Sequence, residues 1–67
     1  MSNRITIGDR VRALRIRMDM TGVELAEKVG VSPPMISNIE NGKKKPGYDT
    51  LIALAKALSC NVDDLVR

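Results

Sequence analysis

Apolar side chains recur along this sequence at the three- and four-residue spacings that place them on one face of an α-helix. The first such series is Ile7, Val11, Leu14 and Met18, which predicts a helix over residues 6–19. The same periodicity predicts four more helices, over residues 22–29, 33–41, 50–58 and 62–66. No segment alternates between apolar and polar positions, so we expect no strand. The pattern thus predicts an all-α protein of five short helices in one domain, residues 1–67.

Polar residues of the kind that cap helices precede several of these segments. Thr6 is followed three residues later by Asp9, which is a weak form of the capping box. Thr21 is followed at the same spacing by Glu24, which is the full pattern. Asn61 is the candidate cap of the last helix. These residues support the predicted starts of the first, second and fifth helices.

The segment from Gly22 to Ile39 has the features of two short helices that cross steeply through a tight turn. Ala26 is small enough to let the helices touch, and Gly30 tolerates the positive φ that such a turn requires. Ile36 and Ile39 are branched anchors that would seat the second helix on the core. The same positions occur in other helical hairpins with a glycine turn. At this point both a helix-turn-helix and a simple hairpin remain open.

Composition excludes several classes of function. Tyr48 is the only aromatic residue, so the core must be aliphatic, and there is no histidine. The single cysteine, Cys60, cannot form an internal disulfide or a metal cluster, and no residue is placed in the sequence to activate it. Asp63 and Asp64 are adjacent, as expected of a solvated helix end and not of an acid/base pair. We therefore expect no enzyme activity, no metal and no cofactor.

The charged residues are more informative in their distribution than in their sum. The net charge is only +3, but four arginines crowd the first predicted helix and Lys43–Lys45 form a run. Such clusters are compatible with nucleic-acid binding. The sequence has neither a signal-peptide pattern nor an apolar run long enough to span a membrane. We expect a soluble cytoplasmic protein.

Four stretches resemble the Cro and phage-repressor (Xre) helix-turn-helix family; they are Ile7–Arg15, Glu24–Ser32, Ile36–Pro46 and Leu54–Leu58. The resemblance extends over nearly the whole chain, from residue 7 to residue 65. It implies a compact five-helix, lambda-repressor-like domain in which the second and third helices form the helix-turn-helix. It also implies a transcriptional regulator, most often a repressor, that binds double-stranded DNA as a homodimer on two-fold related half-sites.

The resemblance assigns base contacts to the third helix, which would enter the major groove. The base-reading positions are then Pro33, Pro34, Ser37 and Asn38. Asn38 can offer a paired donor and acceptor to adenine, and Ser37 can bond to several bases. The two prolines can make only apolar contact, for instance with a thymine methyl group.

A second set of positions would contact DNA phosphates by the same resemblance; it comprises Arg10, Thr21, Gly22, Met35, Asn41, Lys43, Lys44 and Lys45. Two of these depart from the family pattern. Gly22 stands where the family commonly has glutamine, so only its backbone N–H can meet a phosphate. Met35 stands where the family often has serine or threonine, and it could instead be a partly exposed packing residue.

Two structural roles complete the predictions. The family pattern pairs Arg15 with Glu40 as a partly buried ion pair between the first and third helices. Cys60, Leu65 and Val66 are candidates for the dimer contact, with completion of the core as the alternative, notably for Leu65.

The departures at Gly22 and in the proline pair motivate a second hypothesis for function. The fold could serve as a protein-interaction module, or as the antitoxin of a toxin–antitoxin pair, with a protein partner or an additional domain. Loss of affinity with rising salt would distinguish a DNA-binding protein from such a module.

Overall fold

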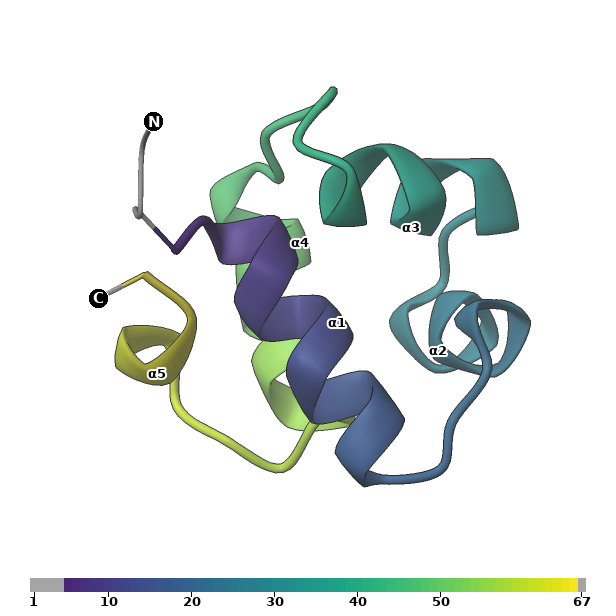
Figure 1. Cartoon of the computed structure of the whole chain (residues 1–67), viewed down its shortest axis with the longest axis horizontal. Helices are drawn as coiled ribbons and strands as arrows, with labels where there is room; N and C mark the ends of the chain where they lie inside the picture. Colours follow the sequence, from purple (N-terminus) through teal and green to yellow (C-terminus); the bar gives the residue numbers. More distant parts are fainter. Residues whose placement is uncertain (1–4, 67) are drawn as a thin grey trace.

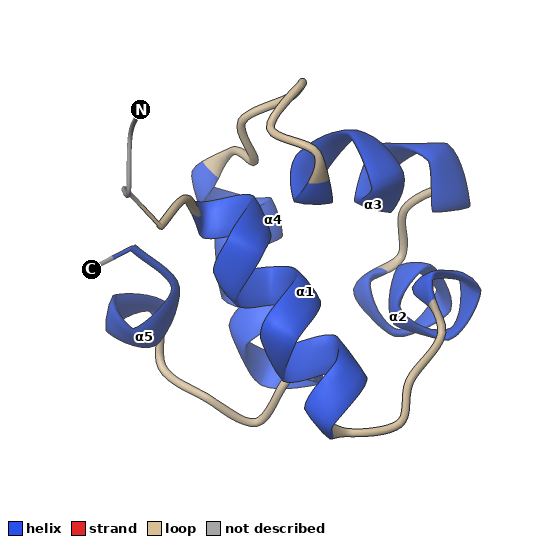
Figure 2. Ribbon diagram, viewed as in Figure 1, coloured by secondary structure: helices blue, strands red, loops and turns tan. Residues whose placement is uncertain are grey.

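The computed structural model describes residues 5–66, and within this range it consists of helices and connecting loops without a strand (Figures 1 and 2). The helices are α1 (Ile7–Arg17), α2 (Gly22–Val29), α3 (Pro33–Glu40), α4 (Tyr48–Ala57) and α5 (Val62–Val66). The predicted all-α, five-helix architecture is therefore confirmed. The ends of the predicted domain, residues 1–4 and 67, lie outside the described residues.

The helices surround a single core. α1 lies in the middle of the molecule, with α5 on one side and α2 on the other (Figure 1). α3 packs on both α1 and α2, while α4 packs on α2 and α5. This arrangement leaves the face of α3 that points away from α1 and α2 at the surface.

Capping residues explain why some helix bounds were predicted correctly. In α1 the amide of Asp9 donates to the Thr6 hydroxyl, and the amide of Thr6 donates to the Asp9 carboxylate. Thr21 and Glu24 form the same reciprocal pair at the start of α2. α2 and α5 have the bounds that the sequence predicted.

The predicted ends of α1, α3 and α4 need correction. α1 ends at Arg17 and not at residue 19, because Asp19 adopts a positive φ of 54°. α4 ends at Ala57 for the same reason, because Ser59 also has a φ of 54°. Each of these residues follows the helix in the left-handed conformation that closes a Schellman motif. Asn41 caps α3 without being part of it.

The start of α4 also differs from expectation, whereas α5 begins where predicted but with a different capping bond. α4 begins at Tyr48, before the predicted residue 50, with Gly47 as an N-cap that has no side chain to signal it. At α5 the amide of Asn61 donates to the Asp64 carboxylate at 2.9 Å. The carboxylate of Asp64, and not the side chain of Asn61, therefore satisfies an amide at this helix start.

The core is aliphatic, as the composition required. Its buried residues are Val11, Met20, Leu25, Ala26, Ile36, Ile39, Leu54, Ala55, Leu58 and Leu65. Met20, which lies in the loop between α1 and α2, was not expected among them. Met18 was predicted on the buried face of the first helix, but it is 42% exposed because the helix has already ended.

Gly8 brings α1 into direct contact with the end of α3. A Cβ atom at this position would lie 2.2 Å from the carbonyl oxygen of Ile39 and 2.7 Å from that of Glu40. Only glycine allows this approach. The contact fixes the end of α3, and with it the start of the following loop, against α1.

Candidate nucleic-acid interface

The turn between α2 and α3 has the geometry of a helix-turn-helix. Gly30 adopts a φ of 87°, and its amide and that of Val31 both donate to the carbonyl of Ala26. Ser32 then caps α3, its hydroxyl accepting from the amide of Met35 at 3.3 Å. Pro33 occupies the first helical position, where a missing N–H costs nothing. The predicted roles of Ala26, which is buried, and of Gly30 are confirmed.

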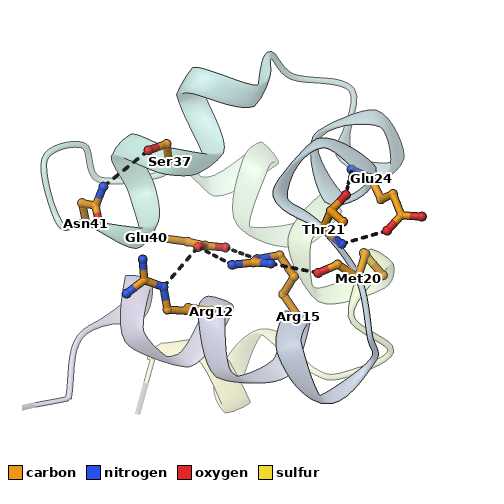
Figure 3. Close-up of polar contacts among 8 residues, drawn as sticks. All are labelled: Arg12, Arg15, Met20, Thr21, Glu24, Ser37, Glu40 and Asn41. Carbon is orange, nitrogen blue, oxygen red and sulfur yellow. Dashed lines mark hydrogen bonds and ion pairs between the residues drawn. The ribbon is translucent and has the colours of Figure 1, made fainter.

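The four predicted base-reading residues lie together on the exposed face of α3. Pro33, Pro34, Ser37 and Asn38 are all exposed. The hydroxyl of Ser37 accepts from the side-chain amide of Asn41 at 3.4 Å, which links the middle of α3 to its end (Figure 3). The side chain of Asn38 has no such partner among residues 5–66. α3 thus presents two polar side chains next to an apolar pair.

A cleft of about 350 Å³ is lined by residues of α1, of the start of α2 and of α3. Its lining includes Thr21, Gly22, Ser37, Asn41 and Arg12. It brings three of the predicted phosphate-contacting positions beside the base-reading face. A Cβ atom added at Gly22 would meet no atom within 4 Å, so glycine is not required there by packing.

The ion pair predicted between Arg15 and Glu40 joins α1 to α3 (Figure 3). Nε of Arg15 donates to Glu40 Oε2 at 2.7 Å and Nη2 donates to Oε1 at 3.1 Å, a bidentate pair. A third bond, from Nη1 to the carbonyl of Met20 at 2.8 Å, holds the loop before α2. The bond to Glu40 raises the pKa of the Arg15 guanidinium, so this residue stays charged.

Arg12 takes part in the same network, although the sequence analysis did not assign it a role. Its Nε lies 3.5 Å from Glu40 Oε1, and its side chain is 54% exposed at the mouth of the cleft. Arg10 lies elsewhere. It lines a groove between α1 and α5 with Leu14 and Cys60, so the structure does not bring it to the other phosphate candidates. The helical period turns Arg12 toward α3 and Arg10 toward α5.

The lysine run is held against the C-terminal end of α3. The amides of Lys43 and Lys44 both donate to the carbonyl of Asn38, at 2.8 and 3.2 Å. Gly42 permits this turn with a φ of 76°. The side chains of Lys43, Lys44 and Lys45 are exposed, and the ion pairs found among residues 5–66 do not include them.

The remaining candidates, which were predicted to contact a phosphate or a second copy of the chain, differ in how deeply they are buried. Met35 is half-buried and packs against the core, as its alternative role required. Leu65 is fully buried, so it completes the core instead of offering a contact to a partner, because α5 turns this side chain inward. Val66 is 47% exposed and Cys60 is half-buried. Burial, and to a smaller extent Asp64, raise the pKa of the Cys60 thiol.

Two negative findings apply to the part of the chain that the structure describes. In residues 5–66 no group of three or more His, Cys, Asp or Glu side chains is placed to hold a metal ion. No helix among these residues is both long enough and apolar enough to cross a membrane.

Comparison with known proteins identifies this scaffold. The family described as Helix-turn-helix matches residues 11–65, which is most of the chain. The chain belongs to this helix-turn-helix family. Its fold is the five-helix, lambda-repressor-like domain that the sequence resemblance implied.

Relatives of this helix-turn-helix chain include phage repressors. It is 37% identical over 62 residues to the immunity repressor protein of Bacillus phage phi105, and 38% identical over 61 residues to repressor protein C2 of Salmonella phage P22. The matches cover 92% and 91% of this chain, but 43% and 28% of the two repressors. The chain therefore spans less than half of the length of either relative.

Solved structures that resemble this chain also include a phage repressor. The P22 c2 repressor in complex with a synthetic operator superposes with a TM-score of 0.92 at 36% identity, covering 96% of this chain and 97% of the other. The solution structure of the DNA-binding domain of that repressor gives a TM-score of 0.91 at 38% identity, with 96% and 84% covered. The chain therefore resembles the DNA-binding domain of a phage repressor in both sequence and fold.

Proposed function

We propose that this protein is a transcriptional repressor that binds a two-fold symmetric operator as a homodimer, with α3 in the major groove. The observation that carries the proposal is the composition of one face. Exposed Ser37 lines the cleft with Thr21 and Gly22. The carbonyl of the next residue, exposed Asn38, accepts from the amides of Lys43 and Lys44, which holds the lysine run beside the same helix. The P22 c2 repressor, which shares this fold, was solved in complex with a synthetic operator, and this supports operator binding by the present chain.

The face combines the two kinds of contact that DNA recognition needs. Exposed cations and backbone amides can bind phosphates, which positions a protein without reading sequence. Side chains on a groove-facing helix can bond to base edges. In this chain Lys43, Lys44 and Lys45 suit the first role, and Asn38 and Ser37 suit the second.

The homodimer is proposed because one short recognition helix contacts few bases, and paired half-sites multiply specificity. Val66 is the exposed apolar side chain that remains from the predicted contact set. Such a regulator of prokaryotic or phage type would act in the cytoplasm and associate with the nucleoid when bound.

The test measures duplex binding by fluorescence anisotropy at several salt concentrations, with a random duplex and with duplexes from the upstream region of its own gene. Wild-type affinity should fall as salt rises, with a log–log slope of about −0.9 for each phosphate neutralised. No binding to any duplex at about 50 mM salt would refute the proposal and favour a protein-interaction module.

Two variants test the division of labour on this face. Lys44→Ala should weaken binding to all duplexes alike and reduce the slope by about 1, while Asn38→Ala should cost about 1–3 kcal/mol of discrimination at one base position. Lys56→Ala is the matched control, because Lys56 is exposed in the last turn of α4 and lines a different groove, with Met18 and Lys28. A change in slope for Lys56→Ala equal to that for Lys44→Ala would contradict the assignment.

A further inference from the structure

Tyr48 is the one aromatic side chain of the protein, and it is 72% exposed. Aromatic rings are the side chains that gain most from burial, and this small core is built without one. The ring instead stands in the first turn of α4, at its first residue. Single exposed apolar residues are common, so exposure alone assigns no role to Tyr48. The evidence for a role of Tyr48 comes from its position next to the lysine run, Lys43–Lys45.

Tyr48 follows Lys45 by three residues, across Pro46 and Gly47. The loop before it is fixed to α3, because the amides of Lys43 and Lys44 donate to the carbonyl of Asn38. The loop passes from the end of α3 directly into α4 (Figure 1). The Cα atoms of Lys45 and Tyr48 can lie about 11 Å apart at most, so these two exposed side chains belong to neighbouring parts of the same surface.

The chemistry of the side chain suits a phosphate. The Tyr48 hydroxyl has no hydrogen-bond partner within the described residues, so its O–H is free to donate to an external acceptor. Tyrosine is among the residues that bond to phosphate and sugar in DNA complexes. The neighbouring Asp49 carries a negative charge, so any attraction for a phosphate at this point comes from the Tyr48 hydroxyl and not from a local positive charge.

We propose that Tyr48 is a DNA-backbone contact, whose hydroxyl donates to a phosphate on the strand that passes Lys43–Lys45. The inference rests on the proposed function, because it requires duplex DNA on the face of α3. It extends the interface from the loop onto α4 by a contact that carries no charge.

The absence of charge gives the contact a distinct signature. A hydroxyl that donates to a phosphate releases no counterion, whereas a lysine does. Tyr48→Phe should therefore weaken binding to random and upstream duplexes by about three- to tenfold, the equivalent of one hydrogen bond, and leave the salt slope unchanged. Lys44→Ala, in contrast, should change the slope.

Tyrosine emission provides an independent readout, since Tyr48 is the only aromatic residue. Adding an unlabelled duplex to the wild-type protein should change this emission in a saturable way. The matched control is the double substitution Tyr48→Phe and Ile16→Tyr, which places the only tyrosine of the protein at position 16 instead of position 48. Ile16 is 58% exposed in the last turn of α1. The C-terminal end of α1 lies away from α3 (Figure 1). The emission of this control should stay constant at the same DNA concentrations.

The outcomes separate the inference from the function on which it rests. If wild type binds duplex but Tyr48→Phe binds equally well, or if the emission does not respond, the inference is wrong and the proposed function stands. Emission that instead changes with protein concentration in the absence of DNA would overturn the inference and assign Tyr48 to contact with a second copy. If wild type binds no duplex, the proposed function itself fails.

Discussion

Glu40 is the one buried charged residue among the described residues, and its ion pair with Arg15 should contribute strongly to the stability of the domain. Its side chain is 5% exposed and accepts two bonds from Arg15, whose side chain is 16% exposed. Removing one partner of such a pair strands the charge of the other. Arg15→Ala and Glu40→Ala should each lower the free energy of unfolding by about 2–4 kcal/mol, as measured by urea denaturation.

Arg12→Ala is the matched control, because this arginine reaches the same carboxylate from a half-exposed position at 3.5 Å. It should cost less than about 1 kcal/mol. Arg15→Lys keeps the charge but loses the bidentate geometry. Its loss of unfolding free energy should therefore lie between those of Arg12→Ala and Arg15→Ala. Equal losses for Arg12→Ala and Arg15→Ala would show that charge alone, and not burial, stabilises the pair.

Single residues also show what a sequence can and cannot predict. The pairing of Arg15 with Glu40 was predicted from family resemblance, and Gly30 from the demands of a turn. Gly8 and Arg12 were missed because their roles depend on how α1 approaches the end of α3. No periodicity in the sequence encodes that approach. The base-reading positions on α3 were assigned from the family resemblance, and their exposure agrees with the helical period, which turns Ile36 and Ile39 to the core.

At the scale of the helices, the residues that end each helix affect stability. Ser59, which follows α4, allows this effect to be tested. Its φ of 54° places an L side chain in a conformation that glycine adopts without cost. Ser59→Gly should raise the free energy of unfolding by about 0.5–1 kcal/mol, measured as a higher thermal midpoint. Gly30→Ala, at a φ of 87°, should have the opposite sign. A lower midpoint for Ser59→Gly would contradict this account of the end of α4.

The same residues explain where the predicted elements were accurate. The bounds of α2 were predicted because Thr21, Glu24 and Gly30 mark both ends by residue type. The ends of α1 and α4 were placed too late because Asp19 and Ser59 take a position where glycine is the usual signal. The start of α4 was placed too late because Gly47 caps it without a side-chain bond.

At the scale of the whole molecule, the fold was easier to predict from the sequence than the residues that make up the proposed DNA-binding face. Helical periodicity and the resemblance suffice for five helices around one aliphatic core, because burial constrains the apolar positions that repeat on the inner face of each helix. The surface is less constrained. The sequence did not indicate that Arg10 would face α5, and it left Leu65 open between a dimer contact and the core, since both positions depend on how α5 returns to α1. The separation of Arg10 from the lysine run confines the proposed DNA-binding face to α2, α3, the loop before α4 and the first residue of α4, Tyr48.

The response of the whole domain to acid follows from two capping carboxylates. The pKa of Glu24 lies below its ordinary value of 4.5 because its carboxylate accepts from the amide of Thr21, with the Thr21 hydroxyl a smaller cause. The pKa of Asp9 is lowered from 3.8 by the same two bonds to Thr6. Because both pKa values are lower in the folded state, the unfolded chain binds more protons as the pH falls. The stabilisation is complete above the ordinary values and is lost as the pH falls through the folded ones.

The double substitution Asp9→Asn and Glu24→Gln tests this, since both amides keep an acceptor for the cap but do not titrate. The thermal midpoint of the wild type should fall more steeply between neutral pH and about pH 3 than that of the variant. The difference should persist at about 0.5 M salt, because these are short hydrogen bonds to backbone amides and not long-range charge interactions. Parallel curves for the two proteins would mean that acid unfolds the domain through other groups.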